Sequence, residues 1–281
     1  MFRKIIAAIF LISMICGVSY GQTKACDELS GSKKAIALKI MNSQHPYSCC
    51  DSTILKCVEK ENPCDVALRL ADSICKDVAK GEKESKIIRG LELRAKSMNP
   101  YGRKFKIDLN GLPVAGEKNA PVTVVVYACA RCPYCSKLVP MMYDVVTKGA
   151  LKGKVKLYFK AFPLKSHKLS KEGGLAMLAA LKLGHFWNYV LKMYSEFDNF
   201  TVDKLYDWAK IEGMDSQKFK EIMNSEEARN ELVASKKEGL ANKVDATPQI
   251  FINNRRYYGF LNIGEVADVL EEEYNRVVTK K

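Results

Sequence analysis

The sequence predicts an α/β fold with a helical insertion, preceded by a small all-α unit rich in cysteine. Two observations predict the α/β part: a β-branched run at 122–128 leads into an apolar helix, and a second strand follows at 155–162. Strand, helix and strand in that order are typical of a parallel crossover unit. A third observation predicts the all-α unit, because six cysteines between Cys26 and Cys75 lie among short segments with helical periodicity.

The first 21 residues have the pattern of a cleaved secretory signal, in which Arg3 and Lys4 precede an apolar run at 5–18. A run of about 14 apolar residues is shorter than the roughly 20 that a membrane-spanning helix needs. We therefore expect an exported protein that is periplasmic or otherwise extracytoplasmic. A lipoprotein anchored through Cys16 and an uncleaved anchor are the alternatives.

Turn-forming residues at 99–102 and 111–113 separate the two groups of cysteines and indicate a domain boundary. The expected parts are a signal peptide at 1–21, a Cys-rich helical domain at 22–102 and an α/β domain at 103–281, with its helical insert at about 168–240.

Apolar periodicity predicts four helices in the first domain. The third is the clearest, since Ala67, Leu70, Ile74 and Val78 recur at helical spacing and Gly81 ends it. The expected ranges are 35–41, 52–60, 66–79 and 87–98.

Strands and helices alternate along the second domain. The run at 122–128 suits a strand buried on both faces, and apolar residues at 138–146 predict the helix after it. The remaining expected elements are a strand at 155–162, helices at 175–183, 187–194, 201–211 and 225–240, strands at 249–253 and 255–259, and a closing helix at 264–277.

The chain is basic, with 45 Lys and Arg against 32 Asp and Glu and a formal net charge of +13. Lysines such as Lys204 and Lys210 are scattered singly over expected helix faces instead of forming an arginine-rich stripe. We therefore expect no nucleic-acid partner.

Ten cysteines are many for 281 residues, and nine remain without Cys16. In an oxidising compartment such a number favours disulfides or redox chemistry. Because nine is odd, at least one of them has no internal partner, and we expect that thiol to be buried, transient or catalytic.

Cys132 and Cys135 form the pair with the strongest chemical signal, in the sequence Cys132-Pro133-Tyr134-Cys135. A helix N-terminus stabilises a thiolate and lowers the pKa of a thiol from about 8.5, so Cys132 is the expected nucleophile. Cys135, one turn into the helix, is expected to resolve the mixed disulfide that Cys132 forms. Pro133 fits the first helical position, because the N–H that it lacks has no partner there.

This motif, with Pro140 five residues after Cys135 and Thr247-Pro248 directly before a strand and hairpin, resembles the thioredoxin superfamily. The segments 116–124 and 162–164 and the large helical insert are similar, more narrowly, to the DsbA/DsbG-type periplasmic oxidoreductases. The similarity covers about 103–281.

The resemblance implies that Pro248 is a cis-proline facing the active-site sulfurs, although only about 5% of X–Pro bonds are cis. It also implies that Thr247 offers its backbone to an extended client peptide. Both residues are therefore expected to bind substrate.

Two positions depart from the pattern. Members of the superfamily often carry a buried carboxylate six residues before the first cysteine, where this chain has Val126, so proton transfer must use another group or water. Cys129 forms a second, overlapping Cys-x-x-Cys with Cys132. A small buried residue is favoured over a spare resolving thiol, and no metal is expected, since no fourth ligand is evident.

Three other side chains are candidates for minor roles. Arg131 either adds positive charge near the Cys132 thiolate or is a solvated loop residue, and the sequence favours neither. For His167 and His185, helix packing or solvent exposure is preferred.

The amino-terminal cysteines have three interpretations. Structural disulfides come first, because so small a core gains from cross-links. A second redox site comes next, since residues 48–106 resemble the CcmH-type domain that handles apocytochrome thiols, with vicinal Cys49-Cys50 in place of Cys-x-x-Cys. A metal site with His45 is third, because the spacings match no common zinc pattern. The cysteines concerned are Cys49, Cys50, Cys57, Cys64 and Cys75.

The expected function is thiol-disulfide exchange between Cys132/Cys135 and the cysteines of exported proteins, with no cofactor. The expected membrane partner is a quinone-linked oxidase or an electron-donating reductase. Pro-Tyr between the cysteines favours an oxidant or isomerase, whereas Thr247 favours an isomerase or reductase, so the direction stays open. The alternatives are a cytochrome c maturation thiol reductase and a non-catalytic chaperone or metal-trafficking protein with the same fold.

Overall fold

The computed structural model describes residues 23–279, so the expected signal peptide at 1–21 lies outside the described residues. The chain divides into two compact units, one ending at Ile87 and the other beginning at Ile88. This division lies earlier than the boundary at 102/103 that the turn-formers predict. Between residues 23 and 279, no helix has the length and apolar character to cross a bilayer.

The first unit is helical, as the cysteine-rich segment predicts. Helix α4 buries Ala67, Leu70, Ile74 and Val78 along one stripe, which are the residues whose spacing predicts it. Threonine side chains cap two shorter helices, since Thr23 and Thr53 accept hydrogen bonds from N–H groups in the first turns. The helices are α1 (Lys24–Asp27), α2 (Gly31–Ser43), α3 (Ile54–Val58) and α4 (Asp65–Ala79), followed by the start of α5 (Glu84–Met98).

Three disulfides cross-link this unit. Cys26–Cys75 joins α1 to the middle of α4. The other two bridges, Cys49–Cys64 and Cys50–Cys57, close the segment around α3. All six cysteines of the group are therefore paired.

The second unit begins inside α5. In it Arg94, only 2% exposed, forms an ion pair with Glu272 at 2.6 Å and another with Asp268. The Ser97 hydroxyl accepts a hydrogen bond from the Tyr258 N–H. These contacts tie the carboxyl-terminal half of α5 to the second unit.

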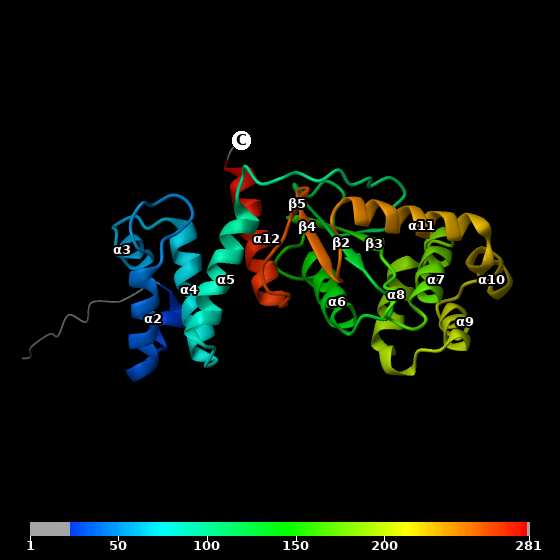
Figure 1. Ribbon diagram of the computed structural model, residues 1–281, viewed down its shortest axis with the longest axis horizontal. Coiled ribbons are helices and arrows are strands. Elements are labelled where there is room, and N and C mark those ends of the chain that lie inside the picture. Colours follow the sequence, from blue (N-terminus) through cyan, green and yellow to red (C-terminus); the bar gives the residue numbers. More distant parts are fainter. Residues whose placement is uncertain (1–22, 280–281) are drawn as a thin grey trace, which may run out of the picture. The chain divides into compact units, whose positions relative to one another are not determined.

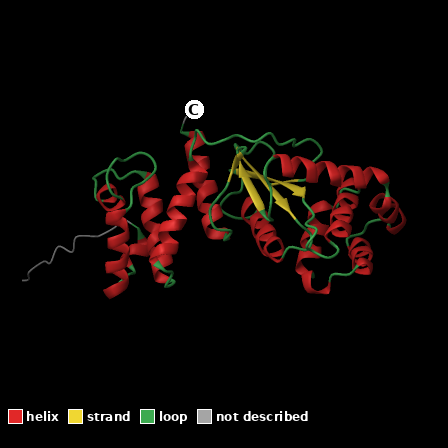
Figure 2. Cartoon of the chain, viewed as in Figure 1, coloured by secondary structure: helices red, strands yellow, loops and turns green. Residues whose placement is uncertain are grey.

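The second unit contains a five-stranded sheet in the order β1-β3-β2-β4-β5 (Figures 1 and 2). Strands β2 and β3 are parallel, with Val122 opposite Val155 and Ala128 opposite Ala161, as the crossover predicts. The other neighbouring strands are antiparallel. The strands are β1 (Val114–Ala115), β2 (Val122–Ala128), β3 (Val155–Ala161), β4 (Gln249–Ile252) and β5 (Arg255–Arg256).

Helices cover this sheet. The helices from α7 to α11 form the insert (Figure 1). Phe105, Tyr127, Phe162 and Phe251 pack edge to face in one core cluster beside the sheet. Helix α1 and strand β1 have no predicted counterpart, and α10 lies inside the predicted helical insert without a range of its own. The helices are α6 (Pro133–Thr147), α7 (Ser170–Lys182), α8 (Phe186–Ser195), α9 (Val202–Ile211), α10 (Ser216–Asn224), α11 (Glu226–Ala241) and α12 (Ile263–Val278), with the 3-10 turn η1 at Phe197–Asn199.

Candidate active site

The two cysteines of the motif lie at the junction between strand β2 and helix α6. Strand β2 ends at Ala128, and Cys132 occupies the N-cap of α6 with an extended backbone. Pro133 follows at the first helical position. Cys135 lies inside the helix and is fully buried. The N-terminal end of α6 therefore presents one sulfur at its cap and shields the other.

The Thr247–Pro248 peptide bond is cis, as the resemblance implies. The Cys132 thiol donates a hydrogen bond to the Thr247 carbonyl oxygen over 3.2 Å, which brings the loop before β4 onto the nucleophile. Cys132 itself is only 2% exposed. The Cys132 sulfur therefore lies against the loop before β4 with little exposure to solvent.

Hydrogen bonds lower the pKa of Cys132 to about 5 against the opposing effect of burial. The largest contribution is the hydrogen bond from the Cys135 thiol, and the Thr247 side chain and the N–H groups of Cys135 and Tyr134 act in the same direction. The Thr247 hydroxyl has no hydrogen-bond partner among the described residues while Cys132 is a thiol. We infer that it donates to the sulfur when Cys132 becomes a thiolate.

Cys135 has the opposite electrostatics. Burial, together with the neighbouring Cys132 sulfur, raises its pKa well above the ordinary value for a thiol. At neutral pH one sulfur is thus a thiolate and the other a protonated thiol. Cys132 is therefore the more reactive sulfur of the pair at neutral pH, whereas Cys135 keeps its proton.

Replacing Thr247 by valine should raise the pKa of Cys132 from about 5 towards about 6, because it removes one hydrogen bond to the thiolate and keeps the carbonyl. The rate of alkylation by iodoacetamide against pH measures this value. In the parent protein the rate should stay nearly flat from pH 6 to 8 and fall as pH drops through the pKa. Thr279→Val, which removes a hydroxyl bonded only to Asn275 O, is the matched control.

Cys129 lies beside the motif but has a different environment. It is 1% exposed, as the interpretation of a buried residue predicts, and burial raises the pKa of its thiol. Its sulfur lies 3.5 Å from His167 Nδ1, so this histidine packs against a buried thiol. His185 precedes α8 as its N-cap residue.

Tyr194 is a buried neighbour of the motif that the sequence analysis missed. Its hydroxyl donates to the Cys129 carbonyl oxygen over 3.2 Å, which fixes the loop before Cys132 against α8. Burial raises its pKa well above the ordinary value. An aromatic residue on an amphipathic helix gives no sequence signal for this role, because core packing produces the same pattern.

Arg131 is anchored, which rules out the solvated loop residue. Its guanidinium lies over the rings of Phe197 and Phe200 and donates to the Phe197 carbonyl oxygen. Hydrogen bonds account for the lowered pKa of Cys132, so Arg131 serves to hold the loop. Tyr134, by contrast, is 69% exposed beside the cysteines.

A glycine brings the insert close to the same loop. A Cβ built at Gly173 in α7 would lie 2.4 Å from the Ala130 Cβ, far inside van der Waals contact. The residue must therefore be glycine for α7 to pack against the loop at this distance. At Gly173, helix α7 of the insert therefore packs closely against the loop that precedes Cys132.

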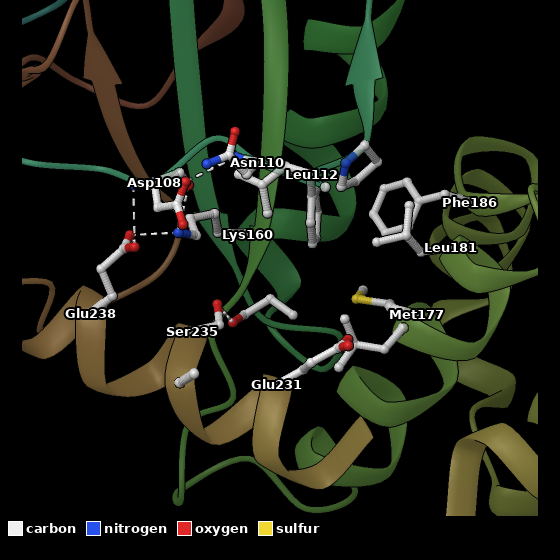
Figure 3. Close-up of a pocket in the computed structure, with 16 residues that line it drawn as sticks. Asp108, Asn110, Leu112, Lys160, Met177, Leu181, Phe186, Glu231, Ser235 and Glu238 are labelled. Atoms are coloured by element: carbon white, nitrogen blue, oxygen red, sulfur yellow. Dashed lines mark hydrogen bonds and ion pairs between the residues drawn. The ribbon is translucent and has the colours of Figure 1, made fainter. Parts of the chain in front are cut away.

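A cavity of about 360 Å³ lies between β3, the segment 108–113 and the insert helices, and no cysteine lines it. Figure 3 shows apolar side chains of Leu112, Met177, Leu181 and Phe186 at one side and charged ones at the other. The charged side is an ion pair between Lys160 and Glu238 at 2.5 Å. Glu238 also accepts a hydrogen bond from the Tyr127 hydroxyl at 2.6 Å, and burial and this bond raise the pKa of Tyr127.

Replacing Glu238 by alanine should lower the free energy of unfolding by about 2 to 3 kcal/mol, because Lys160 stays buried without its charge partner. Urea unfolding followed by circular dichroism measures the loss. Glu231→Ala is the control on the same helix, since its ion pair with Lys182 is more exposed and should contribute less than about 1 kcal/mol. Equal losses in the two variants would contradict the role of burial.

No group of three or more His, Cys, Asp or Glu side chains is placed to hold a metal ion between residues 23 and 279. Cys129, Cys132 and Cys135 are the free cysteines of the described chain. The side chains brought together at the end of β2 suit dithiol chemistry.

The family model described as Thioredoxin matches residues 109–272, more than half of the chain. Among curated proteins, the Na(+)/H(+) antiporter NhaA 1 of Mycolicibacterium gilvum is 27% identical over 178 residues, which cover 61% of this chain and 28% of the antiporter. Disulfide bond formation protein D of Bacillus subtilis is 25% identical over 177 residues, 59% of this chain and 78% of that protein. The chain spans about a quarter of the length of the antiporters.

Among solved structures, oxidised BdbD from Bacillus subtilis superposes with a TM-score of 0.54 at 24% identity, covering 62% of this chain and 98% of BdbD. Wolbachia pipientis alpha-DsbA1 gives the same TM-score at 18% identity. These similarities confirm the predicted α/β fold with a helical insert. By sequence and by fold, the chain belongs to the thioredoxin family, with the architecture of its DsbA-type oxidoreductases.

Proposed function

We propose that this protein is a protein-disulfide oxidoreductase that oxidises the cysteines of exported proteins. The observation that carries the proposal is the asymmetric dithiol, in which hydrogen bonds lower the pKa of Cys132 to about 5 while burial raises that of Cys135. The similarity to disulfide bond formation protein D supports the same chemistry.

The stabilised thiolate supports the oxidising direction of exchange. Hydrogen bonds that stabilise the Cys132 thiolate exist only in the reduced pair, so they favour the dithiol over the disulfide. A pair whose reduced form is favoured takes electrons from a client dithiol. Of the directions that the sequence leaves open, the oxidising one therefore has physical support.

The reaction has two exchange steps. A client thiolate attacks the Cys132–Cys135 disulfide at Cys132, and Cys135 leaves and takes up a proton, as its raised pKa favours. The second client thiolate attacks the client sulfur of this mixed disulfide and releases Cys132 as a stabilised thiolate. Thr247 and cis-Pro248 border the sulfur and are the proposed client-binding residues, with Tyr134 beside them.

Each cycle leaves the protein with a reduced pair, so an electron acceptor must restore the disulfide. We propose a membrane partner of the quinone-linked oxidase class, in an extracytoplasmic compartment to which the apolar segment at 5–18 directs the chain. No bound cofactor is needed, because both electrons reside on the two sulfurs.

The test is the reduction potential of the Cys132/Cys135 pair in glutathione buffers, with the mature chain and with a variant in which the six paired cysteines of the first unit are serine. A value near roughly -120 mV supports the oxidant, whereas a value near roughly -270 mV contradicts it and favours a reductase. A pair that does not cycle contradicts the enzyme and favours a binding protein.

A further inference from the structure

The three disulfides of the first unit differ in how far solvent reaches their sulfurs. Cys26 and Cys75 are 3% and 0% exposed and both lie within helices, so an attacking thiol reaches this bridge less readily than an exposed one. Cys49, in contrast, is an exposed residue, and its partner Cys64 is half-buried. In the third bridge, Cys50 is half-buried and Cys57 is buried. Cys49 is thus the one exposed residue of the six, and the Cys49–Cys64 bridge is the one that a thiolate in solution reaches most readily.

The two sulfurs of this bridge have different local structures. Cys49 lies in the irregular segment between α2 and α3, outside any helix. Cys64 is the N-cap residue of α4, a helix of 15 residues, and its side chain makes no capping hydrogen bond. The N–H groups of the first turn are therefore directed at this end of the bridge.

Charge at this helix end is nearly balanced. Asp65, in the first turn, would oppose a thiolate at Cys64, but Arg69 binds the Asp65 carboxylate with an N–O distance of 2.9 Å. The helix dipole is left to favour negative charge on the Cys64 sulfur. Of the two sulfurs, Cys64 is the better leaving group and Cys49 the more accessible target.

We propose that the Cys49–Cys64 disulfide is a second site of thiol-disulfide exchange, which accepts two electrons from a thiol-bearing peptide independently of Cys132 and Cys135. We expect this site to react with an extended peptide that contains cysteine, because Cys49 lies on an exposed loop that such a peptide can reach. The buried Cys26–Cys75 bridge holds the helices in place while this bridge opens.

The reaction balances as follows. A peptide thiolate attacks Cys49 Sγ, a peptide–Cys49 disulfide forms, and the Cys49–Cys64 bond breaks with its electron pair on Cys64. A second peptide thiolate attacks the peptide sulfur of the mixed disulfide and releases Cys49. The peptide dithiol becomes a disulfide, and its two protons pass to the Cys49 and Cys64 thiolates.

Reduced glutathione, a cysteine-containing tripeptide, is the probe for this site. The full mature chain carrying Cys132→Ser and Cys135→Ser is incubated with it, quenched with acid at successive times, alkylated and mapped by mass spectrometry. Cys49–Cys64 should open faster than Cys26–Cys75 by about tenfold or more, because Cys49 is exposed whereas both cysteines of the slower bridge are buried within helices. Cys50–Cys57, in which Cys57 is fully buried, should fall between them.

The position of the first adduct tests the assignment of the leaving group. Early samples should carry glutathione on Cys49 with Cys64 free, whereas adducts on Cys64 would overturn that assignment. Equal opening rates for Cys49–Cys64 and Cys26–Cys75 would overturn the second site. Because the variant has no Cys132/Cys135 pair, neither result depends on the activity proposed for that pair.

A second variant separates exchange from misfolding. Cys49→Ser with Cys64→Ser should keep the far-ultraviolet circular dichroism of the parent, because Cys26–Cys75 and Cys50–Cys57 remain. Before Cys26–Cys75 opens, this variant should consume less glutathione than the parent. The difference should equal the amount that the reduction of Cys49–Cys64 uses in the parent. Unchanged early consumption would contradict the proposal.

Discussion

Replacing Cys132 by serine should reduce the oxidation of a two-cysteine peptide to background. In the proposed reaction a peptide thiolate attacks the Cys132–Cys135 disulfide, and serine cannot form that bond with Cys135. The variant therefore has no disulfide to transfer, and we expect a loss of at least about a hundredfold. The measurement is the rate at which the peptide disulfide forms, separated by chromatography after an acid quench.

Cys129→Ser is the matched control for this prediction. Cys129 lies in the same loop, but its sulfur contacts His167, and burial raises the pKa of its thiol. We expect this variant to retain most of the activity. If it lost as much activity as the Cys132 variant, Cys129 would have to take part in exchange and the two-cysteine scheme would fail.

Replacing Cys135 by alanine should convert the enzyme into a covalent trap. Cys132 can still attack a client disulfide, but no second sulfur is present to resolve the product, so a one-to-one adduct should accumulate. The adduct appears on a non-reducing gel and disappears with dithiothreitol. Absence of any adduct with a peptide disulfide would show that Cys132 is not the attacking sulfur.

The same variant also tests the origin of the low pKa. The hydrogen bond from Cys135 is the largest contribution that lowers the pKa of Cys132, so its removal should raise that pKa by more than Thr247→Val does. Alkylation against pH compares the two variants. A larger effect of Thr247→Val would assign the dominant role to the loop before β4.

Much of the second unit is predictable because its elements have strong local signals. The β-branched run at 122–128 coincides with β2, and the strand at 155–162 ends one residue after β3. Helix α10 lies inside the predicted helical insert, but its own bounds were not predicted because most of its residues are charged or polar. Asp215 caps it, and Phe219 and Met223 recur at helical spacing. Strand β1 has two residues, too few for an alternating pattern.

In the site, too, residues that belong to a local motif are predictable from the sequence, whereas contacts between distant residues are not. Cys132, Pro133 and Cys135 are adjacent in the chain, so their roles follow from the motif. The partners of Lys160 and Cys129 are 78 and 38 residues away, at Glu238 and His167, and no local pattern pairs them. Disulfide pairing is equally nonlocal, since six cysteines allow fifteen connectivities.

The disulfides of the first unit are nested, with Cys50–Cys57 inside Cys49–Cys64 and both inside Cys26–Cys75. A polypeptide that enters an oxidising compartment amino terminus first presents Cys26, Cys49 and Cys50 before any of their native partners. Oxidation in order of arrival would therefore join the wrong cysteines. During its own biogenesis, this oxidoreductase is expected to need another molecule that rearranges disulfides.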